Sequence, residues 1–154
     1  MLNESLLTFE ILPEAALRLG VATGVGMLLG FERETDNHPA GVRTHAVIAL
    51  SAALVMLTAI LLTGQLDPQG QRMDVLRVIE GMATAAGIIG AGLIVFKQGN
   101  IRNLTTAAHI WLTATIGIAC GAGQYVLVGL AAALGLFVML VVKRLEKSAT
   151  HLRD

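Results

Sequence analysis

Five runs of apolar residues dominate the chain, and short polar connections separate them. The runs cover residues 14–31, 45–64, 78–96, 105–121 and 124–142. Each is close to the roughly 20 residues that a helix needs to cross a hydrocarbon layer about 30 Å thick. The runs are continuous, whereas the strands of a membrane barrel alternate apolar and polar residues over about ten positions. The pattern predicts an all-α, polytopic membrane protein with five transmembrane helices.

The two ends of the chain differ from this apolar body. Residues 1–13 hold apolar positions over too short a length to span, so we expect this segment to lie along the membrane interface. The first fourteen residues contain no Lys or Arg, so we expect no cleavable secretory leader. Residues 143–154 predict a basic cytoplasmic tail. The five-helix membrane domain then covers residues 14–142.

Composition supports the membrane assignment. Of the 154 residues, 55% are hydrophobic and 14% are charged, whereas soluble domains carry about 25% charged residues. The formal net charge is zero, which argues against a nucleic-acid partner. The lipid bilayer is therefore the expected environment of the chain.

Lys and Arg are unevenly distributed among the connections. Because five crossings place the two ends on opposite sides, each connection can be assigned to one side. The side of the carboxyl end collects Arg33, Arg43, Lys97, Arg102, Lys143, Arg144, Lys147 and Arg153. The other side holds Arg18, Arg72 and Arg77. By the positive-inside rule, we expect the C-terminus in the cytoplasm and the N-terminus outside.

Small residues recur every fourth position on several runs. The third run has Ala83, Gly87 and Ala91, and the fourth has Thr113, Gly117 and Gly121. This spacing lets two helix backbones approach closely in lipid, so we expect these two helices to pack through it. The pairs Gly20/Gly24 and Gly26/Gly30 on the first run motivate the hypothesis of a homodimer.

The first polar connection holds several metal-ligating residue types, namely Glu32, Glu34, Asp36, His38 and His45. Their oxygen and nitrogen donors suit a divalent cation. The alternative is a solvated turn in which acids and bases pair locally, and no spacing here matches a defined metal motif. Both interpretations stay open at this point.

Asp74, Arg77 and Glu80 are spaced three apart at the entry to the third run, close to one face of a helix. Arg77 can bridge both carboxylates, and an unpaired Glu80 inside an apolar run would be costly. One interpretation is an arginine that neutralises its neighbours and anchors the helix at the interface. The other is a proton-responsive or cation-binding outer vestibule.

Thr106, His109 and Thr113 form a polar stripe on the fourth run. Imidazole changes charge near neutral pH, so His109 is a candidate pH sensor. The alternative is that His109 packs against a neighbouring helix while the threonines bond their own backbone. Cys120 lies in an apolar stretch, as a buried structural cysteine would. No arrangement of nucleophile, base and acid is present, so we expect neither an enzyme nor a cofactor.

Several motifs occur in one order: Gly30-Phe31-Glu32-Arg33-Glu34, Ala40-Gly41-Val42-Arg43-Thr44-His45, Asp74-x-x-Arg77, Gly87-Ile88-Ile89-Gly90-Ala91-Gly92, Leu104-Thr105-Thr106-Ala107-Ala108, Trp111-Leu112-Thr113-Ala114 and Ile116-Gly117-Ile118-Ala119-Cys120-Gly121. Together, over about residues 20–125, they resemble the MgtC/SapB family of bacterial inner-membrane proteins, in the short form that includes the YhiD proteins. Longer members carry a soluble C-terminal domain, which we do not expect here.

The resemblance implies a multi-pass inner-membrane protein tied to growth or survival under magnesium limitation, acid or host-cell stress. Prototype members look like regulators that restrain the F-type ATP synthase, which makes that enzyme an expected partner. A magnesium, cation or proton transporter or channel is the alternative function. A structural assembly subunit is a third class.

The resemblance also implies importance for particular residues. These are Asp74 with Arg77 as its partner, Cys120, Glu32, Arg33, Arg43, Thr44 and His45. Three positions depart from the family pattern. Glu80 stands where a small or apolar residue is expected, His109 where a small polar or acidic one is common, and Asn103 where glycine is usual. The departures suggest a pH-responsive variant.

Overall fold

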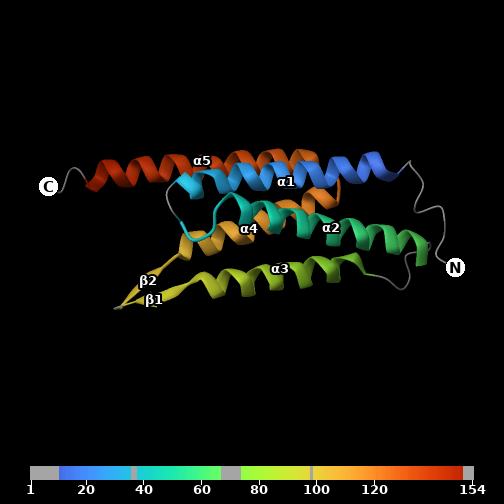
Figure 1. Cartoon of the computed structure of the whole chain (residues 1–154), viewed down its shortest axis with the longest axis horizontal. Coiled ribbons are helices and arrows are strands. Elements are labelled where there is room, and N and C mark those ends of the chain that lie inside the picture. Colours follow the sequence, from blue (N-terminus) through green and yellow to red (C-terminus); the bar gives the residue numbers. More distant parts are fainter. Residues whose placement is uncertain (1–10, 36–37, 67–73, 98, 151–154) are drawn as a thin grey trace.

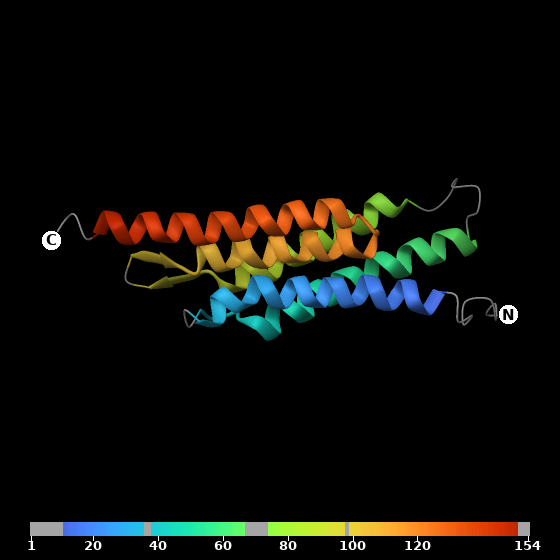
Figure 2. The same ribbon diagram turned by 90° about the horizontal axis from the view of Figure 1, so that it is seen from above.

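The computed structural model describes residues 11–35, 38–66, 74–97 and 99–150, with side chains as far as residue 141. These ranges contain the helices α1 (Ile11–Thr35), α2 (Val42–Leu66), α3 (Val75–Leu93), α4 (Leu104–Gly121) and α5 (Tyr125–Thr150). The helices lie side by side in an elongated bundle (Figure 1). Helices α1, α3 and α5 run in one direction, and α2 and α4 run in the other (Figure 2).

The alternating directions place the polar connections at two ends of the bundle. The α1–α2 and α3–α4 connections and the end of α5 share one end, which we call the hairpin end (Figure 1). The start of α3 and the turn between α4 and α5 lie at the opposite end. The connections that the sequence assigned to the cytoplasmic side therefore do lie together.

Helices α1 to α4 are long and apolar enough to cross a membrane, and α5 has a shorter apolar stretch, Tyr125–Val141. Large apolar side chains such as Leu54, Leu134 and Phe137 are exposed on the outside of the bundle, as a lipid-facing surface requires. The expectation of a bundle of helices, most of them able to span a membrane, is confirmed. The fifth crossing and the sidedness stay predictions, and residues 1–10 of the expected interfacial segment lie outside the described residues.

A short antiparallel ribbon joins α3 to α4, so the chain is not entirely helical. Strand β1 (Val95–Lys97) pairs with β2 (Asn100–Arg102), with Phe96 opposite Ile101. The expectation that the third helix continues to residue 96 is wrong. Ile94 is already extended, at φ −75° and ψ 122°, and Gly99 at φ +80° provides the left-handed turn that closes the ribbon.

Asn103 precedes α4 in the left-handed conformation, at φ 65° and ψ 17°. Glycine favours this region, and asparagine adopts it more readily than most other residues. The Asn103 Nδ2 donates a hydrogen bond of 3.0 Å to the carbonyl of Leu93 at the end of α3. The position where glycine was expected thus keeps a glycine-like backbone and adds a bond across the connection.

Glycines allow α2 to pack closely between α1 and α4. A Cβ on Gly26 of α1 would lie 2.7 Å from the carbonyl oxygen of His45. A Cβ on Gly117 of α4 would lie 2.5 Å from the carbonyl oxygen of Ala49. These contacts are the close backbone approaches that small residues permit in lipid.

The expected pairing of small residues between the third and fourth helices is wrong. Gly117 and Gly121 of α4 face α2, whose alanines are small enough to meet them, so that face of α4 is occupied. Helices α3 and α4 pack instead at Gly90, where a Cβ would lie 3.2 Å from the Ala107 carbonyl oxygen. A Cβ on Gly87 would meet nothing within 4 Å.

The same geometry corrects the basis of the proposed homodimer. Gly26 and Gly30 face α2 within the chain and are not available to a second copy. Cβ atoms on Gly20 and Gly24 would meet nothing within 4 Å. The first helix therefore offers one of its two glycine pairs to a neighbour.

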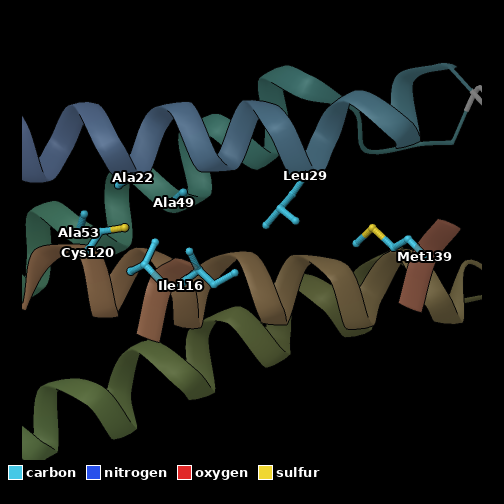
Figure 3. Packing of buried hydrophobic residues seen from close by; sticks show 8 residues of the cluster. Ala22, Leu29, Ala49, Ala53, Ile116, Cys120 and Met139 are labelled. Carbon is cyan, nitrogen blue, oxygen red and sulfur yellow. The ribbon is translucent and has the colours of Figure 1, made fainter. Parts of the chain in front are cut away.

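The centre of the bundle is an apolar core (Figure 3). Its buried residues come from α1, α2, α4 and α5 and are Ala22, Leu29, Ala49, Ala53, Ile116, Cys120, Val128 and Met139. Cys120 has no exposed surface and packs in this cluster. The structural interpretation of Cys120 therefore fits its position.

Candidate functional site

A buried arginine links α1 to α4 at the hairpin end. Arg33, in the last turn of α1, is 7% exposed. Its Nε donates to Nδ1 of His109 at 3.0 Å, and its Nη2 lies 2.9 Å from Nε2 of the same ring. A neutral imidazole has one acceptor nitrogen, so the ring accepts one of these contacts as a hydrogen bond. His109 thus contacts a neighbouring helix, as the packing interpretation expected.

Glu32 and His45 extend this cluster. Glu32 Oε2 lies 3.1 Å from Arg33 Nε, and both side chains are largely buried. His45, in the first turns of α2, has no exposed surface, and its ring meets that of His109 edge to face with centroids 6.2 Å apart. Residues from two of the motifs noted in the sequence, on α1 and α2, therefore converge with His109 of α4.

Two buried polar atoms beside this cluster retain hydrogen-bonding capacity. His45 Nδ1 lies 2.9 Å from the Gly41 carbonyl oxygen, so Nδ1 donates and Nε2 is the acceptor. Within the described part of the chain, neither His45 Nε2 nor the fully buried Thr106 Oγ1 has a hydrogen-bond partner. A buried polar atom without a hydrogen-bond partner lowers the stability of the fold by about 1–3 kcal/mol. These two atoms therefore destabilise the bundle where α1, α2 and α4 meet. Thr113, by contrast, bonds the His109 carbonyl at 2.8 Å.

The other described residues of the α1–α2 connection form no group that could hold a metal ion. Glu34 Oε2 accepts a hydrogen bond of 3.0 Å from the backbone N–H of Val42, which caps the start of α2. Asp36 lies outside the described residues. Among the residues that are described, no three His, Cys, Asp or Glu side chains are grouped to hold a metal ion. Arg43 and Thr44 are exposed at this end.

Asp74, Arg77 and Glu80 lie at the opposite end of the bundle. Asp74 is the N-cap of α3, since its Oδ1 accepts from the Leu76 N–H at 2.9 Å. All three residues are exposed. In the described ranges, no ion pair joins Arg77 to either carboxylate. The structure therefore gives Asp74 a capping role and leaves Arg77 and Glu80 on the surface of α3.

Sequence analysis missed the structural role of Arg18. Its Nη1 donates to the Gly121 carbonyl at 2.8 Å, and its Nε pairs with Glu14 at 2.7 Å. The guanidinium thus satisfies a free carbonyl at the end of α4 and covers the turn at Gly123, which has φ +73°. The Glu14–Arg18 spacing of four is a signal for the local ion pair, but nothing in the sequence indicates the contact with Gly121.

Comparison with known proteins places these features in a family. The model of the MgtC family matches residues 19–148. The chain is 42% identical to Protein SapB of Bacillus subtilis over 78% of its own length and 53% of that protein. It is 36% identical to Protein MgtC of Brucella abortus, over 76% of the chain and 46% of the relative. It is 37% identical to Protein MgtC of Salmonella typhimurium, over 71% of the chain and 44% of that relative.

The chain spans about half the length of these curated relatives. No solved structure matches it significantly. The expected resemblance is confirmed by the family model and by the relatives together. The chain belongs to the MgtC family.

Proposed function

We propose that this chain is a regulatory protein of the bacterial inner membrane that acts through other membrane proteins under magnesium limitation, acid stress or intracellular growth. The stress conditions and the F-type ATP synthase as partner come from the family resemblance. The five crossings and the cytoplasmic C-terminus belong to the same proposal. They follow from the run lengths and from the positive-inside rule.

One observation carries the choice of a regulator over a transporter. Among the described residues, the charged and imidazole side chains of the two clusters lie toward opposite ends of the bundle: Arg33, His45 and His109 near the hairpin end, and Arg77 and Glu80 near the start of α3. The apolar core of Figure 3 lies between them, with Leu29, Ile116 and Cys120 fully or almost fully buried. An ion crossing a single copy would have to pass this packed apolar layer. The arrangement supports a regulator whose polar ends bind other proteins over a transporter with a path through its centre.

The hairpin end is the expected contact region for a partner. Arg43 and Thr44 are exposed there, beside the buried cluster that ties α1, α2 and α4 together. Lys97 and Arg102 of the ribbon are exposed at the same end. A partner that binds this surface therefore contacts α2 and the ribbon, beside the buried contact of Arg33 with His109.

The test separates regulation from transport. Inverted membrane vesicles with and without the chain are assayed for ATP-driven proton pumping, and liposomes holding the pure chain are assayed for passive magnesium and proton flux. We expect reduced pumping in the first assay and no flux in the second. A flux that Asp74→Asn abolishes would contradict the proposal and establish a transporter. Unchanged pumping would remove the ATP synthase as partner.

A further inference from the structure

Helix α3 is one of the weakly covered members of the bundle. It lies at the edge of the bundle and packs mainly against α4 and α2 (Figure 1). Only 11% of its apolar window is buried within the chain, the same share as for α1 and far below the 56% of α4. Its inward face is marked by the buried Ala86 and Gly90. Most of its surface therefore meets whatever surrounds the chain.

The outward face of α3 has an unusual composition for a surface in contact with lipid. Its exposed residues are Leu76, Arg77, Glu80, Gly81, Thr84, Ala85, Gly87, Ile88, Ile89, Ala91 and Gly92, so small or polar residues outnumber the large apolar ones. The exposed face of α5 instead carries mainly large apolar residues, namely Tyr125, Val126, Leu127, Leu130, Leu134, Phe137, Val138 and Leu140, with Gly129 and Ala133 as its small ones. Large apolar side chains suit lipid, whereas small residues are enriched where membrane helices pack against each other. By this comparison, the exposed surface of α5 suits lipid better than that of α3, and the surface of α3 suits contact with another helix.

The outward glycines leave room for a second backbone. A Cβ placed on Gly81, Gly87 or Gly92 would meet nothing within 4 Å. Thr84 does not need a polar partner, because its Oγ1 bonds the Glu80 carbonyl at 2.8 Å. Its remaining surface is therefore a methyl group that can pack.

The charges on this face identify the neighbour. Glu80 is about 8 Å inside α3 along the helix axis, at about 1.5 Å per residue, and is exposed there. Arg77 lies three positions earlier on the same face, and neither has an ion-pair partner among the described residues. Charges exposed within a membrane helix pair with one another or mark a site. A face that carries one cation and one anion is complementary to a second copy of itself.

We propose that two copies of this chain pair through the outward faces of α3, side by side in the same orientation. In a two-fold interface, residue i of one copy meets residue j of the other, and j meets i. Arg77 of each copy then pairs with Glu80 of its partner, since their offset of about 4.5 Å along the axis is within reach of long side chains. Thr84 and Ile88 lie near the two-fold axis, where the small residues allow close packing.

Disulfide crosslinking tests the contact directly. Thr84→Cys and Ile88→Cys are introduced singly into a Cys120→Ala background and oxidised in native membranes, with Leu134→Cys on α5 as the matched control. We expect a crosslinked dimer at position 88 and none at position 134. Equal crosslinking at positions 88 and 134, or none at either 84 or 88, would overturn the proposal. A crosslinked product with the mass of a different protein would overturn it as well.

Charge exchange tests the pairing within that contact. Arg77→Glu in the Ile88→Cys protein should lose most of the crosslinked dimer, because four carboxylates then meet. The double variant Arg77→Glu/Glu80→Arg restores opposite charges in a second copy and should restore the dimer. Failure of the double variant to recover would overturn the self-complementary pairing, provided that equal membrane insertion and helix content show it is folded. A monomeric mass in nanodiscs would also contradict it, whichever function the chain has.

Discussion

Arg33 of α1 lies against His109 of α4, with Nε 3.0 Å from Nδ1 and Nη2 2.9 Å from Nε2. The family resemblance led us to expect a role for Arg33 and singled out His109 as a departure from the expected pattern. The contact joins them across 76 positions of sequence. His109 is therefore the polar neighbour of the Arg33 guanidinium, and a change at either residue alters the surroundings of the other.

Replacing Arg33 with alanine should destabilise the bundle. The change leaves the largely buried Glu32 without the guanidinium 3.1 Å away and removes the contact with His109. Breaking one side of a buried ion pair costs about 3–5 kcal/mol. We expect the free energy of unfolding to fall by an amount near the lower end of this range, because the Glu32 side chain is still 11% exposed. Steric trapping in bicelles measures this free energy of unfolding.

Arg43→Ala provides the matched control, since Arg43 is an exposed arginine at the same end. Exposed substitutions usually change stability by no more than about 0.5 kcal/mol. Equal losses for the two variants would show that the buried cluster contributes nothing specific.

Acidification to pH 5 should leave the contact between α1 and α4 intact. Protonating the His109 ring would place a second cation about 3 Å from the Arg33 guanidinium. Two like charges 4 Å apart repel by on the order of 4 kcal/mol at an effective dielectric constant of about 20, and Glu32 offsets only part of this repulsion, so the ring resists protonation. Spin labels at the exposed positions 31 and 105 should therefore keep the same distance between pH 7 and pH 5. An increase of that distance at pH 5 that His109→Ala abolishes would refute the prediction.

The helices of this chain were predictable because the signal for a membrane helix is local. A continuous apolar run of the right length indicates a span wherever its neighbours lie. The runs at residues 45–64 and 105–121 accordingly fall within α2 and α4. The positions of the connections follow from the alternation of direction, which places residues 38–41 and the ribbon at the same end.

Pairing between helices was not predictable, because spacing does not name the partner. Gly117 and Gly121 recur every fourth position, as do Gly87 and Ala91, but the first pair meets α2 and Gly87 meets no other helix. The ribbon was missed because Val95 and Phe96 are as apolar as the helix before them. The link from Arg33 to His109 was missed because a long-range contact leaves no local pattern.

The backbone at Asn103 should tolerate glycine better than alanine. Asn103→Ala places a Cβ residue at φ 65° and removes the hydrogen bond to the Leu93 carbonyl. A strained left-handed residue costs about 1–3 kcal/mol, and a lost hydrogen bond costs about 1 kcal/mol. Asn103→Gly loses only the bond, so stability should fall in the order Asn, Gly, Ala. Thermal unfolding in detergent tests this order, and equal stability of the Gly and Ala variants would contradict it.

Two glycines on α1 should respond oppositely to the same substitution. Gly26→Ala places a Cβ 2.7 Å from the His45 carbonyl oxygen and 2.9 Å from Ala46 Cα, so α1 and α2 must separate. Overpacking of this kind costs about 1–3 kcal/mol. Gly24→Ala meets nothing within 4 Å and should be neutral or stabilising by up to about 1 kcal/mol, because alanine favours the helix. Steric trapping compares the two in one lipid composition. If Gly24→Ala proved as costly as Gly26→Ala, the close approach of α1 to α2 at Gly26 would no longer explain why glycine is needed there.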